Sequence, residues 1–306
     1  MTPEIFAEWL RRQGRTVIKT QSSYWADFGP RVLQAFPYHW VISPSEEELN
    51  ELLRSSRAVG LRYSAPVDSP EGMYSYHTVY EEKHYLLQDF TSKMRTKVRK
   101  GLASVRVENI PLETLAEQGW QLRQETLLRQ GRPNAETRSW WRALCLSAKD
   151  LQGFEAWGAF DEDELAAAVL VFVCGDTASI LYHQSLTRYL RNRVNNALTF
   201  IVTNSLLSRQ NISRIFYGLH SLDAPSSMDE FKFEMRYTAK PVRQRVVFHP
   251  WLRPFMNRAS HALLRAGLRL KPAHPILSKA EGMLRFYLQG RLPLEKQSLP
   301  PPLQSK

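Results

Sequence analysis

Residues 154–219 carry the pattern that most restricts the fold of this chain. Three strand-like segments come in succession, joined by short turns at 161–163 and 175–176, and they read FEAWGAF, ELAAAVLVFV and ASILYHQS. A long helical segment, NRVNNALTFIVTNSLLSR, comes next, and the strand-like ISRIFYGL follows it. Hairpins pair antiparallel, whereas a helix between two strands of one sheet is typical of parallel pairing. The region therefore predicts a mixed α/β sheet, which ends in the strand PVRQRVVFH.

The rest of the chain divides around this region. SPSEEELNELLRSSR predicts a helix with a serine cap, VGLRYSAP a strand, and TSKMRTKVRKGLA a strongly basic helix. SVRVENI alternates like a strand, and 112–150 predicts two helices around the break QGRPNAE. We therefore expect an N-terminal lobe at 1–110, connecting helices at 111–153, a C-terminal lobe at 154–249 with its helix at 193–209, and a basic helical tail with a disordered end at 250–306.

Length and composition exclude several classes of protein. The 306 residues suit two ordinary domains, and no apolar run approaches the roughly 20 residues that span a bilayer. Cys145 and Cys174 lie far apart in apolar surroundings, without histidines at zinc-ligand spacing, so no metal site is predicted. The motifs of serine hydrolases and zinc proteases are missing. Because the N-terminus has no signal-peptide hydrophobic region, we expect a cytoplasmic protein of bacterial type.

The net charge of +11 is concentrated in the tail, because residues 251–306 supply +8 of it. SKAEGMLRFYLQG predicts a helix that begins with a capping box of Ser278 and Glu281 and ends at Gly290. An earlier helix, around 255–270, places four basic side chains on a common stripe: Arg258, His261, Arg265 and Arg269. An apolar face beside a basic stripe suits docking onto the protein's own sheet. It also suits binding to the surface of an anionic membrane, in which case the protein would be peripheral to the inner face of that membrane.

The stretch from Ser221 to Val242, SLDAPSSMDEFKFEMRYTAKPV, carries the most specific motif. A strand ending in IFYGL leads into a loop that contains Asp223, and FKFEMRY follows. This order resembles the FemAB-like branch of the GNAT acyltransferase superfamily, in particular its BioF-type acetyltransferase domains. The strand HYLLQDF followed by the basic segment SKMRTKVRKGL resembles a second motif of that branch. Arg236 stands where the branch has a glycine.

The resemblance implies two GNAT-like lobes that transfer an acyl or aminoacyl group to an amine. Donors in the superfamily are acyl-CoA, such as acetyl-CoA, or aminoacyl-tRNA, and no metal is required. The acceptor would be a small-molecule or lipid-linked amine of a cell-envelope or polysaccharide precursor. Acyl-CoA enzymes hold pyrophosphate with a glycine-rich loop before the central helix, but TRYLRNRVNNAL contains no glycine there. The candidate phosphate-binding residues are instead Arg188, Arg191, Arg193, Asn195 and Asn196; a solvated basic face explains the arginines equally well.

Acyl transfer needs a proton acceptor and a group that stabilises the oxyanion. Lys232 is the candidate for the oxyanion, and it would lie opposite Phe231 if the chain is extended there, so that Phe231 packs into the sheet and Lys232 points into the cleft between the lobes. Candidate bases are Asp229, Glu230, Glu234 and, best placed by the resemblance, Asp223. Tyr182 and His183 leave the third strand near the expected cleft, and His183 titrates near neutral pH. Tyr217 and Phe231 are expected to flank the site.

Two other functions stay open. Arg236 and the glycine-free helix entry favour a non-catalytic binding protein with a GNAT fold. The basic helix favours a tRNA-dependent aminoacyl transferase if it binds RNA; its cations are Lys93, Arg95, Lys97, Arg99 and Lys100.

Overall fold

The computed structural model describes residues 1–29, 31–132, 136–222, 227–271 and 274–304. Contacts divide the chain into two compact units. Unit 1 comprises 1–13, 78–218 and 226–238, and unit 2 comprises 14–77, 219–225 and 239–306. The units are discontinuous in sequence, unlike the linear domain boundaries that the sequence predicts, because the chain passes from one unit to the other within strand β5 (Met73–Tyr80) and again near residues 219, 226 and 238.

Unit 1 is built on a mixed sheet with the strand order β10-β9-β8-β7-β6. β10 runs parallel to β9 and the other neighbours are antiparallel, as the hairpins and the intervening helix predict. The predicted α/β fold class with mixed sheets is therefore confirmed. The strands are β6 (Arg106–Ile110), β7 (Phe154–Asp161), β8 (Glu164–Cys174), β9 (Thr177–Ser185) and β10 (Arg214–Leu219).

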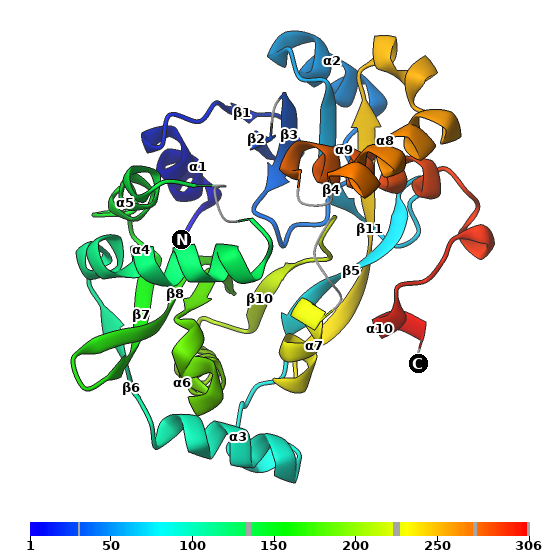
Figure 1. The fold of residues 1–306 in the computed structure, drawn as a ribbon. Helices are drawn as coiled ribbons and strands as arrows, with labels where there is room; N and C mark the ends of the chain where they lie inside the picture. The colour runs from blue at the N-terminus through cyan, green and yellow to red at the C-terminus, as the bar shows by residue number, and fades with distance from the viewer. Residues whose placement is uncertain (30, 133–135, 223–226, 272–273, 305–306) are drawn as a thin grey trace. The chain divides into compact units, whose positions relative to one another are not determined.

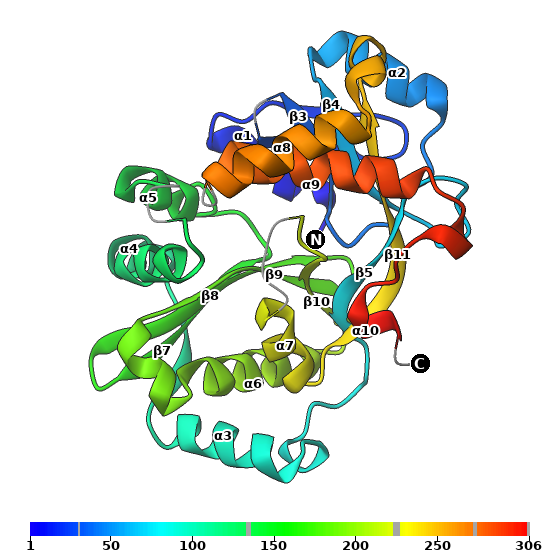
Figure 2. The same ribbon diagram turned by 45° about the vertical axis from the view of Figure 1, so that its right-hand side comes forward.

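Helices cover both faces of this sheet (Figures 1 and 2). On one face lie α4 (Leu112–Arg129) and α5 (Arg138–Leu146). On the other lies α6 (Val194–Leu207), with α3 (Ser92–Leu102) packed against its outer side. The core between α6 and the sheet is aliphatic and aromatic, and β8 is buried on both faces, which explains its unbroken apolar run. Unit 1 also contains α1 (Pro3–Arg12) and α7 (Ser227–Glu234).

Unit 2 has its own mixed sheet, in the order β1-β2-β3-β4-β11. β3 and β4 are parallel, and the other pairs in this order are antiparallel. The strands are β1 (Val17–Lys19), β2 (Tyr24–Gly29), β3 (Val32–Phe36), β4 (Gly60–Ala65) and β11 (Thr238–Phe248). On one face lies α2 (Glu46–Ser56), whose first turn is capped by Ser45 as the sequence predicts. Val247 of β11 packs with α2, while Val246 and Phe248 point to the other face.

The tail docks on this second face through α9 (Pro275–Gly290). Met283, Leu284 and Phe286 are buried against the sheet, so docking on the protein's own sheet holds for this helix. The predicted start at Ser278 is wrong: α9 begins at Pro275, and the ring of His274 caps it by accepting the Leu277 N–H. Glu281 is not part of a capping box because it pairs with His261 of α8 (Arg258–Leu270). The short α10 (Pro301–Gln304) follows.

Close contact between α3 and α6 depends on Gly101. A Cβ at this position would lie 2.5 Å from the Arg193 carbonyl oxygen and 2.9 Å from the Ala197 Cβ, so the two helices would have to separate. Gly267 of α8 has no such constraint, because a Cβ there would meet only a Leu277 methyl at 3.6 Å.

We expect Gly101→Ala to lower the free energy of unfolding by about 1–3 kcal/mol through overpacking. The matched Gly267→Ala should instead raise it by about 0.5–1 kcal/mol, since alanine is the better helix former. Urea denaturation of both variants tests this contrast. Equal stabilities would show that α3 does not pack on α6 as described.

Candidate functional site

The candidate site in unit 1 lies where the pairing of β9 with β10 ends. The parallel register runs from Arg214–Thr177 to Phe216–Ser179, and in the described part of the chain it goes no further. The ladder with β8 continues but slips: Val171 pairs with Ile180 and Leu170 with Tyr182. Leu181 is therefore an extra residue, a bulge of the kind that redirects the side chains that follow it. Past this point, side chains of the two strands meet instead of backbones.

His183 and Tyr217 make that contact. The His183 Nδ1 and the Tyr217 hydroxyl are hydrogen-bonded, and the two rings are stacked. Burial, together with the positive charges of Lys232 and Arg129, lowers the pKa of His183 to about 4, and the Asn195 side chain opposes this shift. The ring is thus neutral near pH 7. Burial also raises the pKa of the Tyr217 phenol above its ordinary value. A neutral imidazole and a neutral phenol can pass a proton between them.

Lys232 brings a cation to this pair. Its Nζ lies 5.2 Å from the centre of the Tyr217 ring and 2.7 Å from a carboxylate oxygen of Asp229. Both side chains of this ion pair are nearly buried, with 14% and 12% of their surface exposed. Gly218 leaves room beside the ammonium, because a Cβ there would lie 3.8 Å from Nζ and its φ of 136° is one that glycine adopts most easily. The site therefore places the Lys232 ammonium next to the hydrogen-bonded pair of His183 and Tyr217.

Lys232 and Phe231 lie in helix α7, so the predicted extended chain is wrong. Phe231 is partly buried against the core and its ring meets that of His183 edge-on at 6.1 Å. The two side chains diverge because successive residues of a helix point about 100° apart. Asp223, the base favoured by the resemblance, lies outside the described residues.

Arg236 ends α7 in a left-handed conformation, with φ at 65°, where the resembled family has glycine. The Arg236 N–H donates to the Phe233 carbonyl and the Tyr237 N–H to the Lys232 carbonyl, which is the Schellman pattern of a helix end. The arginine thus replaces the glycine without changing the turn. A non-glycine residue in this conformation costs about 1–2 kcal/mol.

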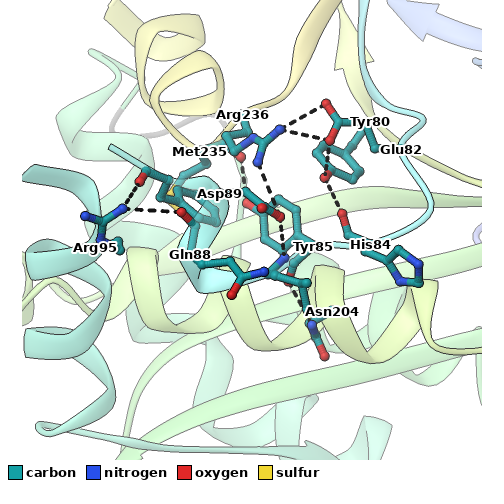
Figure 3. Close-up of polar contacts among 12 residues, drawn as sticks. Tyr80, Glu82, His84, Tyr85, Gln88, Asp89, Arg95, Asn204, Met235 and Arg236 are labelled. Carbon is teal, nitrogen blue, oxygen red and sulfur yellow. Dashed lines mark hydrogen bonds and ion pairs between the residues drawn. The ribbon is translucent and has the colours of Figure 1, made fainter. Parts of the chain in front are cut away.

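Side-chain contacts oppose this cost (Figure 3). The Arg236 guanidinium pairs with Glu82 at 2.9 Å and with Asp89 at 3.4 Å. The Tyr85 hydroxyl donates to the Met235 carbonyl at 2.6 Å, and Asn204 of α6 donates to the Tyr85 carbonyl at 2.8 Å. The segment before α3 therefore fastens the end of α7 to α6, and this fixes the position of Lys232.

Three other predicted residues, Asn195, Tyr182 and Asn196, have different surroundings in the structure. Asn195 joins the site through His183, and its Oδ1 is buried. Tyr182 does not join the site, because it points to the opposite face of the sheet, where it packs edge-on against Trp141 and under the Arg123 guanidinium. Asn196 is buried and donates to the sulfurs of Met94 and Met235, so its side chain belongs to the core.

The first turn of α6 is partly covered by α3. Val194, Asn196 and Ala197 are buried, and α3 lies against them at Gly101. The predicted phosphate ligand Arg188 is half-exposed and pairs with Glu164, and Arg191 is exposed in the 3-10 segment Thr187–Asn192. A pyrophosphate needs accessible N–H groups at a helix start; α3 covers one side of this start, while Arg193 is exposed and Asn195 is half-buried.

Sequence reasoning missed two residues that shape the site. Arg129 of α4 donates to the Ser185 carbonyl at 2.9 Å, at the end of β9, and its charge acts on His183. Thr199 of α6 interacts with the Tyr217 hydroxyl. Neither belongs to a motif, and only the packing of helices on both faces of the sheet brings them there. Asp229, considered as a base, is the ion-pair partner of Lys232.

Comparison with known proteins places the fold. No protein-family model and no curated protein matches the sequence. Among solved structures, FemX matches with a TM-score of 0.56 at 12% identity, over 81% of this chain and 92% of FemX. The C-terminal DUF2156 domain of a protein described as a lysylphosphatidylglycerol synthetase, from Agrobacterium fabrum, matches with a TM-score of 0.52 at 12% identity, over 86% of this chain and 91% of that domain.

A conserved protein of unknown function from Bacteroides thetaiotaomicron matches with a TM-score of 0.52 at 9% identity, over 78% of this chain and 87% of that protein. At such identities the likeness concerns the fold. The chain shares the fold of FemX and of the DUF2156 domain, in line with the resemblance to the FemAB-like branch that its two sequence motifs indicated.

Proposed function

We propose that the protein is an acyltransferase that moves an acyl or aminoacyl group from an activated ester to an amine of a lipid-linked or other cell-envelope precursor. The observation that carries the proposal is the buried Lys232–Asp229 pair beside the hydrogen-bonded Tyr217 and His183. The chain shares its fold with FemX and with a domain of a protein described as a lysylphosphatidylglycerol synthetase, and this likeness supports the same reaction class.

Each group has a defined part in the proposed reaction. The amine nitrogen attacks the acyl carbon, and negative charge develops on the carbonyl oxygen, which the Lys232 ammonium stabilises. In the tautomer with its proton on Nε2, His183 accepts the Tyr217 proton while Tyr217 takes one from the amine. The new C–N bond forms as the ester C–O bond breaks. The leaving oxygen then takes a proton from Tyr217, and Tyr217 regains its own proton from His183. Amine and ester thus become amide and alcohol, with no net proton change.

The partly covered start of α6 favours an aminoacyl-tRNA donor over acyl-CoA. Exposed cations on α3, among them Lys93, Arg99 and Lys100, offer charge for an RNA backbone. The reaction would take place in the cytoplasm, at or near the inner face of the membrane that carries the acceptor. No helix among the described residues is long and apolar enough to cross a membrane.

A labelled transfer assay tests the donor and the reaction. The protein is incubated with a bacterial extract of lipids and lipid-linked precursors, together with a mixture of tRNAs charged with radiolabelled amino acids or, in parallel, with radiolabelled acetyl-CoA. We expect label in an alkali-stable amide product from the charged tRNAs. Label from acetyl-CoA alone would overturn the donor assignment. Binding of charged tRNA without transfer to any acceptor would favour the non-catalytic binding protein.

Lys232→Met should lower the rate of transfer on the order of 100-fold or more, because it removes the stabilising charge. It also removes the ion pair that the buried Asp229 carboxylate makes with Lys232, which destabilises the fold. The double variant Lys232→Met with Asp229→Asn should regain stability without regaining activity. Lys83→Met, an exposed lysine of the same unit, serves as the control and should match the wild type. Recovery of activity in the double variant would make Lys232 a structural residue only.

The neutral state of His183 predicts a pH dependence of stability. Its pKa is about 4 in the folded protein, below the ordinary value of 6.5, so the unfolded chain binds an extra proton between these values. The protein should therefore lose stability as the pH falls from 6.5 to 4, on the order of 1–3 kcal/mol from this residue. The variant His183→Phe should lack this part of the loss, whereas His84→Phe, at an exposed position, should keep it. Urea titrations at pH 7 and pH 4.5 measure the difference, and identical pH slopes in wild type and His183→Phe would contradict a neutral buried imidazole.

A further inference from the structure

Helix α8 presents an apolar stripe away from the body of unit 2. It has no buried residue, and its exposed positions include Ala259, Leu263, Ala266 and Leu270, which recur at the spacing of one helix face. Leu263 is 75% exposed and Leu270 is 85% exposed. Such a row of outward leucines on a helix that already packs on α9 by its other side implies an external apolar partner.

A basic stripe runs beside the apolar one. Arg258, Arg265 and Arg269 are exposed at the neighbouring positions, and Lys271 follows the helix end. The sequence from 251 to 280 contains no Asp or Glu, so no acid of its own offsets these charges locally. Just before the helix, Trp251 and Phe255 are exposed by 54% and 61%. Exposed aromatic rings, leucines and cations close together in sequence are the residue types that match the polar and apolar layers of an anionic bilayer.

Behind the stripe lies an apolar cavity of about 410 Å³ between the sheet and helices α8 and α9. It is lined mainly by aliphatic and aromatic side chains, among them Val32, Phe248, Leu264, Met283 and Leu284. Leu263 and Ile276 also line it, and both are more than half exposed, so the cavity opens on the surface that carries the stripe. Lys279 is the one charged side chain among the described lining residues, and its Nζ lies 5.1 Å from the centre of the Phe28 ring.

We propose that α8 lies in the surface of a membrane containing anionic phospholipid, and that the cavity beneath it receives one acyl chain of such a lipid. The mainly apolar lining of the cavity suits an acyl chain, while Lys279 and the arginines of the basic stripe would face the anionic headgroups. A second copy of α8 fits less well, because an isologous pair would bring the arginines of both copies together. RNA would use the cations but leave the leucines exposed to water.

The inference is independent of catalysis, so its test uses no turnover. The full-length protein is sedimented with vesicles of phosphatidylglycerol and phosphatidylcholine, and with vesicles of phosphatidylcholine alone. We expect binding to the anionic vesicles that weakens as salt is raised. Leu263→Asp with Leu270→Asp should reduce the bound fraction about tenfold or more, and Arg265→Gln with Arg269→Gln should reduce it as well.

Matched variants control for general effects of these substitutions. Leu128→Asp changes a leucine of α4 that is 63% exposed, and Arg142→Gln changes an exposed arginine of α5; both should bind vesicles like the wild type. Equal losses in these controls would overturn the assignment to α8. The proposal would also fail if the double leucine variant bound vesicles normally but changed a dimer of the wild type into a monomer in sedimentation analysis. It would fail as well if the wild type did not bind vesicles and the double arginine variant lost binding to tRNA.

A cavity-filling variant tests the acyl-chain site separately. Ala280 lines the cavity, and Ala280→Phe should occupy part of its volume while the exposed stripe stays unchanged. After incubation with phosphatidylglycerol in detergent, native mass spectrometry should show one retained lipid on the wild type and at least about tenfold less on Ala280→Phe. A thermal melt confirms that the variant is folded. Equal lipid retention by both proteins would remove the cavity from the proposal.

Discussion

The hydrogen bond from the Tyr237 N–H to the Lys232 carbonyl is the contact on which the site depends. It closes the end of helix α7, and it forms only because Arg236 adopts a left-handed conformation. The arginine can hold that conformation because Glu82 and Asp89 bind its guanidinium. The ion pairs of Arg236 with Glu82 and Asp89 therefore help to fix the position of the Lys232 ammonium on α7. Around Tyr217, burial then sets the protonation of the remaining groups.

The same geometry explains why the groups differ in what they can do. Lys232 forms an ion pair with Asp229, whereas His183, which has no carboxylate in its described contacts and lies near two cations, stays neutral. A charge that does not move and a proton that does are the two requirements of amide formation from an ester. In the proposed reaction, Lys232 and the Tyr217–His183 pair supply them where β9 leaves β10, because a bulged strand exposes side chains that a continuous ladder would cover.

The order of elements was predictable from the sequence because periodicity and turn residues are local. The hairpins of 154–185, the helix at 194–207 and the basic helix at 92–102 all follow from such patterns. The site was predictable only in part. Lys232 was a candidate through the resemblance that includes FKFEMRY and His183 through its place at the end of the third strand, but their helical and bulged surroundings depend on tertiary contacts. Asn196 and Arg188 looked like phosphate ligands, since no local signal reveals that Gly101 lets α3 approach the start of α6 or that Glu164 binds the arginine.

Arginine has positive φ at four described positions, namely Arg31, Arg57, Arg193 and Arg236. Two of these begin or end the helices that frame the candidate site. A sequence pattern that looks for glycine at such turns passes over this chain, although its backbone turns in the same way. Each of these bends also carries a long cationic side chain, and at Arg236 that side chain binds the carboxylates of Glu82 and Asp89. Chains with this substitution are therefore found more readily by comparing folds than by comparing letters.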